Sequence, residues 1–236
     1  MFKLKHHFLD TNVILSIPLE NKNYRDCIKY FKLDYERHIS NHVKVEIFQV
    51  IARLRLISLN IFNHIKDYIL SKNISLIKID SHIHNIKSSY LHKYKDLDYV
   101  FGIEKDRFLD IVNEVFINYH DEIKDTLMYN DVNLSLLSSK LKKLFDKYDN
   151  IINKCLSNFD ISSFVNNQNI VDKLIKIGIH ESDSIIVDDC YNKALEINEK
   201  FVFITYDKKI LESSEDAFKL LNSKVYFSKP VSFLNN

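Results

Sequence analysis

The sequence predicts an α/β fold, a three-layer α/β/α arrangement around a central parallel sheet, interrupted by a mostly helical insertion. Two observations predict the sheet: short segments that are apolar throughout occur near both ends of the chain, and helical patterns separate them. Strands of this kind are typical of parallel sheets that helices cover on both faces. A third observation, the helical pattern that dominates the middle of the chain, predicts the insertion.

The first part of the core contains three expected strands and two expected helices. Residues 7–9 form a short apolar strand, and a helix is expected at about 24–35. A second strand ends at Ser40, whose hydroxyl can cap a long helix that begins at about Asn41. The segment 74–79, ISLIKI, is the next strand candidate.

The alternation of strand and helix resumes near the end of the chain. A helix is expected at about 182–197 and a fully apolar strand at 201–204. A short helix at about 217–221 and a last strand at 225–227 complete the pattern.

The chain of 236 residues is expected to form one domain, with a core from about 1–80 and 180–236 and a helical insertion at about 81–179. Hydrophobic residues make up 46% and charged residues 28%, which is the balance of a folded globular protein. No apolar run is long enough to span a bilayer, and three distant cysteines suit reduced thiols, so we expect a cytoplasmic protein with no membrane partner. The two glycines exclude a glycine-rich phosphate loop, and the net charge of +1 does not by itself indicate a nucleic-acid partner.

Aspartates follow two of the expected strands. Asp10 comes directly after the strand at 7–9, and Asp207 comes shortly after the strand at 201–204. In an open parallel sheet, ligands gather beyond the carboxyl ends of the strands. Both carboxylates are therefore expected at the same edge of the sheet.

Two further acids lie on apolar faces of expected helices. Asp183, in the first turn of its helix, shares a face with Val187, and Glu46 lies on a mostly apolar side of the helix after Ser40. Acids in such positions point towards the edge of the core and away from bulk water. Asp188 and Asp189 lie off this face, so we expect them to be solvated.

Four carboxylates at one edge would repel one another unless cations compensate their charge. Mg²⁺ or Mn²⁺ suits such a site, since these ions take oxygen ligands and commonly combine few carboxylates with water and phosphate oxygens. A cation held there can activate water and stabilise a phosphodiester under attack. Each acid also has a structural interpretation, because Asp10 and Asp207 can cap turns or helices and Asp183 suits a helix N-terminus. The convergence of all four favours the metal site.

The same residues carry a resemblance to the PIN-domain family. The segment 8–15, FLDTNVIL, resembles the opening of PIN domains, and Ser40 with Glu46 resembles their second motif. The segment 183–186, DSII, is similar to their third motif, and 203–207, FITYD, is similar to their fourth. The resemblance covers the two ends of the chain, with the motifs in the family's order.

The resemblance implies a PIN-like fold and an endoribonuclease that uses Mg²⁺ or Mn²⁺ to hydrolyse RNA. It assigns metal binding and catalysis to four carboxylates: Asp10, Glu46, Asp183 and Asp207. Asn12 and Thr205 would orient these ligands by hydrogen bonds.

Alternatives to this interpretation stay open. The chain could be a catalytically inactive PIN-fold module that binds RNA or protein, or a structure-specific DNA nuclease that shares the chemistry. The segment between Glu46 and Asp183 is much longer than in compact members of the family, many of which are toxins of toxin–antitoxin pairs. A homodimer and an antitoxin-type protein partner are also compatible with the resemblance.

The insertion contains two groups that could contact RNA. Tyr90, Lys93 and Tyr94 interleave aromatic and basic side chains, which suits stacking on bases and neutralising phosphates. Lys142 and Lys143 belong to a second basic group. The hypothesis that they guide RNA competes with a plainer one, a solvated helix surface with packed tyrosines.

Histidines are numerous, at ten, but they do not indicate zinc by their spacing. The nearest candidates are His82 with His84 and His180 beside Glu181, and neither pair has further ligands at zinc-site spacing. Surface or cap roles are favoured for them, with His180 also placed to shape the mouth of the acidic site.

Overall fold

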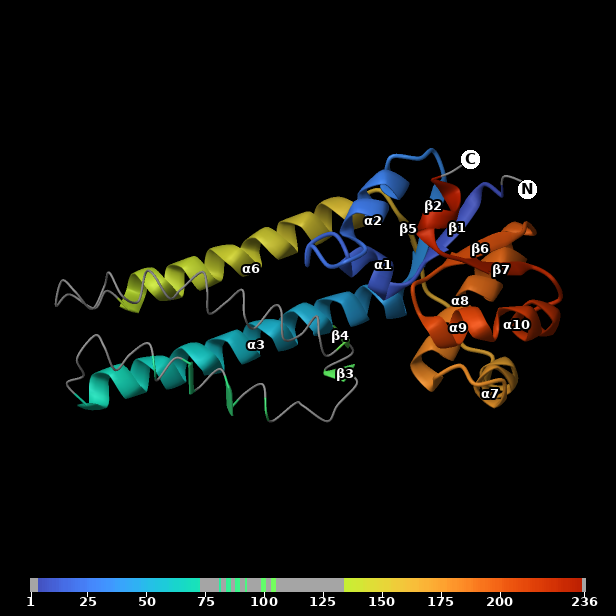
Figure 1. Ribbon diagram of the computed structural model, residues 1–236. Coiled ribbons are helices and arrows are strands. Elements are labelled where there is room, and N and C mark those ends of the chain that lie inside the picture. Colours follow the sequence, from blue (N-terminus) through green and yellow to red (C-terminus); the bar gives the residue numbers. More distant parts are fainter. Residues whose placement is uncertain are drawn as a thin grey trace. The chain divides into compact units, whose positions relative to one another are not determined.

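The computed structural model (Figure 1) describes residues 4–72, 81, 84–85, 88–89, 92, 99–100, 103–104 and 134–234. The chain divides into two compact units, the first formed by Met1–Phe48 with Asn150–Asn236 and the second by Gln49–Asp149. The strand expected at 74–79 lies outside the described residues. Within the described ranges, no helix combines the length and the apolar character that a membrane span requires.

A five-stranded parallel sheet forms the centre of the first unit (Figure 1). Its strands are β1 (His6–Leu9), β2 (Glu36–Ser40), β5 (Asp160–Ser162), β6 (Phe201–Ile204) and β7 (Val225–Ser228). They lie in the order β5-β2-β1-β6-β7, and every neighbouring pair is parallel. The predicted α/β class with a parallel sheet is therefore confirmed.

The chain builds this sheet outward from β1 in two directions. It passes from β1 to β2 and β5 on one side, then crosses over to β6 and β7 on the other. β1 and β6 are consequently adjacent strands from which the chain departs in opposite directions. Every residue of these two strands is buried, as expected for central strands with both faces covered.

Helices complete the first unit. They are α1 (Thr11–Leu15), α2 (Tyr24–Phe31), α7 (Gln168–Lys176), α8 (Glu181–Ile197), α9 (Lys208–Glu212), α10 (Ser214–Leu220) and the 3-10 helix η1 (Pro230–Phe233). The start of α3 (Asn41–Lys72) and the end of α6 (Leu134–Leu156) also belong to it. α3 begins directly after β2, where the amide of Val43 donates to the Ser40 hydroxyl at 3.3 Å, as the sequence predicted.

The two faces of the sheet are covered by different helices. α8 packs against β2, β6 and β7 on one face. On the other face, His7 of β1 stacks on Tyr35, with ring centroids 3.9 Å apart, and on Tyr30 of α2. Phe233 of η1 lies 4.7 Å from the same His7 ring. Because successive strand residues point to opposite faces, His7 faces α2 and η1 while His6 and Phe8 face the α8 side.

The second unit contains the remainder of α3 and α6 with two short strands, β3 (Tyr99–Val100) and β4 (Ile103–Glu104), which pair antiparallel. Arg55 of α3 joins the two helices: its Nη2 lies 2.7 Å from Asp149 Oδ2, and its guanidinium lies over the Phe145 ring. Because the ion pair is partly exposed, its electrostatic stabilisation is modest. The contact between the guanidinium and the Phe145 ring adds to it.

Most predicted elements of the core agree with the structure, and two differ. The helix expected at 24–35 ends at Phe31, where the last carbonyls of α2 accept hydrogen bonds from the Arg37 guanidinium. The segment expected to be a mostly helical insertion, about 81–179, also contains the strand β5, which pairs with β2 and belongs to the first unit. A strand of three residues is too short to show a period, so only its partner reveals it.

Candidate carboxylate site

The carboxyl ends of β1 and β6 form the candidate site. Leu9 and Ile204 are paired in the register of these strands, so the residues that follow them, Asp10 and Thr205, emerge side by side. The amide of Asp10 donates to the carbonyl of Ile204 at 3.0 Å, which ties the two chain segments together just past the sheet. This is the point at which the chain direction diverges, the usual position of ligand sites in open α/β sheets.

Asp10 is the most enclosed carboxylate of the site, with 4% of its surface exposed. Its Oδ1 accepts from the amide of Thr11 at 2.7 Å, so it caps α1. Its Oδ2 accepts from the Thr205 hydroxyl at 2.6 Å and from Asn12 Nδ2 at 2.5 Å. Asn12 and Thr205 therefore hold the Asp10 carboxylate in one orientation from two sides.

The same two side chains reach the segment that carries Asp207. Asn12 Oδ1 accepts from the amide of Tyr206 at 3.0 Å, and Thr205 Oγ1 accepts from the amide of Asp207 at 2.8 Å. Asp207 also caps α9, because its Oδ1 accepts from the amide of Ile210 at 3.0 Å. The helix-capping role that the sequence analysis considered for Asp207 is thus present, and it engages one of the two carboxylate oxygens.

Glu46 joins the site through a residue that sequence reasoning did not single out. The Thr11 hydroxyl donates to Glu46 Oε2 at 2.5 Å, which connects α3 to the segment after β1. Thr11 itself is buried. Its hydroxyl could have been noticed as part of the Asp-Thr-Asn segment, but its partner is 35 residues away and has no local signature.

Asp183, in the first turn of α8, completes the group. Burial, followed by the negative charges of Asp207 and Glu46, raises the pKa of its carboxyl to about 6. His180 and Lys209 oppose this rise, which places a histidine and a lysine side chain near Asp183. The predicted buried face of α8 is also observed, since Val187 is fully buried.

The electrostatics of Asp10 show that the four acids act on one another. Burial, followed by repulsion from Asp183 and Glu46, raises the pKa of Asp10 to about 8, although the hydrogen bonds from Thr205 and Thr11 lower it. Each of the four predicted acids thus interacts with at least one other across elements far apart in the sequence. Without a compensating cation, this edge disfavours full ionisation.

The spacing of the four acids limits how a cation could bind. Across the described part of the chain, one group of three His, Cys, Asp or Glu residues has ligand atoms that all lie within 4.8 Å of one another, and it is His6, Glu36 and His38. Ligands of one octahedral Mg²⁺ lie at most about 4.2 Å apart. In this geometry, at most two of the four carboxylates can contact one ion directly, and the others would reach it through water.

The expectation that Asp188 and Asp189 are solvated is wrong, since neither has exposed surface. Asp188 Oδ2 accepts from the amide of Asn167 at 2.7 Å, and Asp189 Oδ2 lies 2.8 Å from His42 Nδ1. Asn166 also donates to Asp189, at 3.3 Å. The segment between β5 and α7 therefore covers this side of α8. The helical pattern alone could not predict this, because it gives no information on which other segments pack against the helix.

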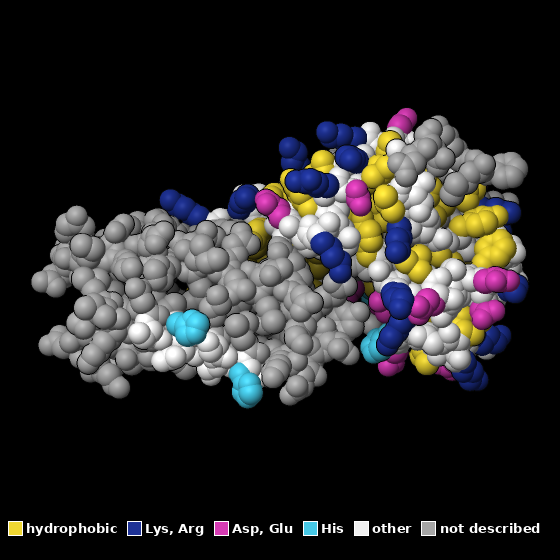
Figure 2. Space-filling model, viewed as in Figure 1, with side chains coloured by type: hydrophobic (Ala, Val, Ile, Leu, Met, Phe, Trp, Pro, Cys, Tyr) yellow, Lys and Arg dark blue, Asp and Glu magenta, His cyan; other side chains and the backbone are white. Residues whose placement is uncertain are grey.

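The candidate RNA contacts of the insertion are not brought to this site by any described contact. Tyr90, Lys93 and Tyr94 lie outside the described residues, while Lys142 and Lys143 are exposed on α6 in the second unit. On the face drawn in Figure 2, lysine and arginine side chains are interspersed with acidic and apolar ones. This distribution agrees with the net charge of +1.

Among the histidines weighed above as zinc ligands, His82 lies outside the described residues and His84 is exposed. His180 occupies the N-cap position of α8 without a side-chain capping hydrogen bond, and its Nδ1 lies 2.9 Å from the Ser182 hydroxyl. Two other histidines, His6 and His38, meet on the sheet, which no spacing in the sequence indicated.

Comparison with known proteins adds nothing to these observations: neither a protein-family model, nor a curated protein, nor a solved structure matches this chain. The resemblance to PIN domains therefore rests on the sequence motifs.

Proposed function

We propose that this chain is a metal-dependent nuclease that hydrolyses RNA phosphodiester bonds at the edge formed by Asp10, Glu46, Asp183 and Asp207. One observation carries the proposal. Four acids from separate elements lie near enough to interact at the edge of the sheet where ligands usually bind, and burial with repulsion from Asp183 and Glu46 raises the pKa of Asp10 to about 8. A bound divalent cation would stabilise the ionised form of carboxylates whose pKa is raised in this way.

The residues present fit Mg²⁺ or Mn²⁺ better than a softer metal, since all four offer carboxylate oxygen. Asp10 and Asp207 would anchor the ion, while Glu46 and Asp183 would hold its water shell. When bound, the cation supplies an activated water and neutralises charge on the phosphate. Hydrolysis would join the oxygen of a water molecule to phosphorus, break the bond to the leaving oxygen and move one proton of the water to that oxygen, without a covalent enzyme intermediate.

The chain's own hydrogen bonds support this arrangement. Thr205 and Asn12 both donate to Asp10 Oδ2, so they would keep its orientation constant when the carboxylate is ionised. Thr11 would do the same for Glu46. Lys209, near Asp183, would attract a phosphate towards the site, and His180 lies beside the same carboxylate.

The experiment is cleavage of labelled single-stranded RNA with Mn²⁺, comparing the wild-type chain with Asp10→Asn and Asp207→Asn. Asp216→Asn, which removes an exposed acid from α10, is the matched control. Each site variant should lose about 100-fold or more in rate, because a metal contributes several kcal/mol to transition-state stabilisation and each 1.36 kcal/mol is tenfold. The control should cleave like the wild type.

Other outcomes would redirect the assignment. Faster cleavage of single-stranded or flap DNA than of RNA would favour a DNA nuclease with the same site. Absence of cleavage on varied RNAs, with no Mn²⁺ binding by calorimetry, would refute the nuclease and leave a binding module.

A further inference from the structure

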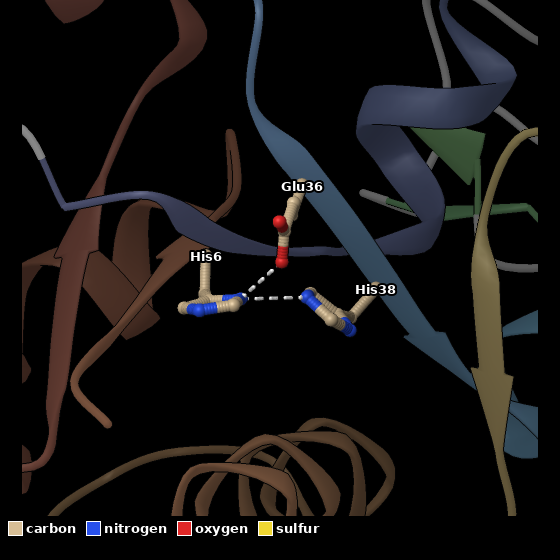
Figure 3. Close-up of side chains that lie close together, drawn as sticks. All are labelled: His6, Glu36 and His38. Carbon is tan, nitrogen blue, oxygen red and sulfur yellow. Dashed lines mark hydrogen bonds and ion pairs between the residues drawn. The ribbon is translucent and has the colours of Figure 1, made fainter. Parts of the chain in front are cut away.

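A second polar cluster consists of His6, Glu36 and His38 (Figure 3). It lies towards the start of β1 and β2, at the opposite end of these strands from the carboxylate site. His6 and Glu36 are the first residues of β1 and β2 and are paired in the register, while His38 is paired with Phe8 further along β2. In a parallel pair, residues two apart on a strand share a face. His6, Glu36 and His38 therefore gather on the α8 side of the sheet.

Three ligand atoms of this cluster converge. His6 Nδ1 lies 3.1 Å from His38 Nε2 and 3.1 Å from Glu36 Oε2. All three atoms lie within 4.8 Å of one another. Zinc holds nitrogen at about 2.0–2.1 Å, so neighbouring ligands of a tetrahedral site are about 3.4 Å apart. The observed spacing is close to that of an occupied site.

The other nitrogen of each histidine faces a carboxylate. His6 Nε2 lies 3.1 Å from Glu199 Oε2, and His38 Nδ1 lies 3.1 Å from Asp160 Oδ2. Lys193 Nζ, 2.9 Å from the same Asp160 oxygen, helps to hold that carboxylate in place. Metal-binding histidines characteristically donate their second ring N–H to such a partner.

These outer carboxylates favour an N–H on the ring nitrogens that face them. If Glu199 and Asp160 each accept an N–H, the two remaining ring nitrogens and Glu36 Oε2 all present lone pairs to the same point. Three acceptors at this distance repel one another unless a cation lies between them. A divalent metal ion at that point would remove this repulsion.

Burial and neighbouring charge fit a metal ion. His6 and His38 are 5% and 4% exposed, so they are already desolvated and held by packing on Phe201. The Glu36 side chain is 46% exposed and can admit water as a fourth ligand. Lys5 pairs with Glu36 Oε1, which leaves Oε2 for the shared point.

We propose that His6, Glu36 and His38 bind a divalent transition metal of the zinc class and thereby join the starts of β1 and β2. Two imidazoles with one carboxylate favour zinc over Mg²⁺ or Mn²⁺, which prefer oxygen ligands. The site is separate from the carboxylates beyond β1 and β6, and it does not depend on nuclease activity.

The test is calorimetric titration of the metal-stripped full chain with Zn²⁺ at neutral pH. The wild type should bind one zinc through this site. His38→Gln should abolish that binding, while Glu36→Gln and Glu199→Gln should each weaken it about tenfold or more. His84→Gln, which changes an exposed histidine of the second unit, should bind like the wild type.

Two further measurements separate this site from its competitors. Asp10→Asn should keep the zinc, because that variant alters only the carboxylate site. Co²⁺ added to the wild type should give the visible absorption of a tetrahedral site, and the surface variant Glu36→Gln should reduce it without loss of fold by circular dichroism.

The proposal is overturned if the wild type shows no saturable zinc binding. It is equally overturned if His38→Gln and Glu36→Gln bind zinc as tightly as the wild type, or if Asp10→Asn removes the zinc.

Discussion

Replacing Asp10 by asparagine should stabilise the metal-free protein and abolish the stabilisation that added Mn²⁺ is expected to give. The folded state raises the pKa of this carboxyl from 3.8 to about 8, chiefly by burial and then by repulsion from Asp183. The folded chain must therefore keep a proton on Asp10 at pH 7, whereas the unfolded chain releases it. An asparagine side chain carries no charge in either state, so this penalty disappears in the variant.

The magnitude follows from the difference between pH 7 and the unfolded pKa of 3.8. Each pKa unit corresponds to 1.36 kcal/mol, so holding the proton costs about 4 kcal/mol of folding free energy. The introduced amide cannot replace every acceptor that the carboxylate offers to Thr11, Thr205 and Asn12, and the disturbed hydrogen bonds should cost about 2 kcal/mol. The variant should gain about 2 kcal/mol in the absence of metal, which is the difference between these two effects.

The pH dependence has a definite sign. Because the folded pKa lies above the unfolded value, the penalty is absent below pH 3.8, grows as pH rises, and is complete above about 8. Stability of the wild type relative to Asp10→Asn should therefore fall steadily across this range.

The assay is urea unfolding in EDTA at several pH values, followed by circular dichroism, with Asp216→Asn as the control for loss of an exposed charge. Adding Mn²⁺ should reverse the order, since only the wild type can bind it at Asp10. The reasoning is refuted if Asp10→Asn unfolds at lower urea than the wild type at pH 7 without metal, or if the difference does not change with pH.

Three other predictions test the site and the fold around it. Thr205→Val should reduce RNA cleavage about 10- to 100-fold through loss of the hydrogen bond to Asp10, and Thr205→Ser should restore it, measured as rate at saturating Mn²⁺. Mn²⁺ at about 100 times its Kd should raise the free energy of unfolding of the wild type by about 2.7 kcal/mol and leave that of Asp207→Asn unchanged, measured by thermal unfolding. Equal shifts in Tm for the two proteins would place the ion elsewhere. His7 is fully buried, and burial lowers its pKa to about 3, so its ring should stay neutral from pH 7 down to about 4 in histidine NMR spectra. Its folded pKa lies below the unfolded 6.5, so His7 contributes a loss of stability as pH falls from 6.5 towards 3, and a ring that titrates near 6.5 would contradict this.

The two proposed metal sites would have different consequences for the molecule. The proposed ion at the carboxylate edge would relieve repulsion among the acids and take part in the proposed hydrolysis. An ion at His6, Glu36 and His38 would lie where β1 and β2 begin, so its removal should loosen the sheet without acting directly on the reacting phosphate.

Local patterns in the sequence were sufficient for the main strands and helices of the core. β6 is apolar throughout because both of its faces are buried, and that property is visible in four consecutive residues. The start of α3 was equally visible, since a serine cap acts within three residues of itself. The aspartates that follow β1 and β6 could be placed at one edge because parallel strands share their direction.

Contacts between distant segments could not be read in this way. β5 is recognisable only by its pairing with β2, and Asp188 and Asp189 are buried only because the segment before α7 packs over them. A helical period describes one helix and contains no information on what covers it.

The sequence by itself therefore determined the α/β class, the direction of the strands and the position of the four acids in their elements. Tertiary structure decided which side chains meet: Thr11 with Glu46, His6 with His38, and Asp10 with Thr205. The physical reason is the distance along the chain over which each effect acts. Propensity, capping and periodicity act over a few residues, whereas a register between strands or a hydrogen bond between elements depends on how the whole chain packs.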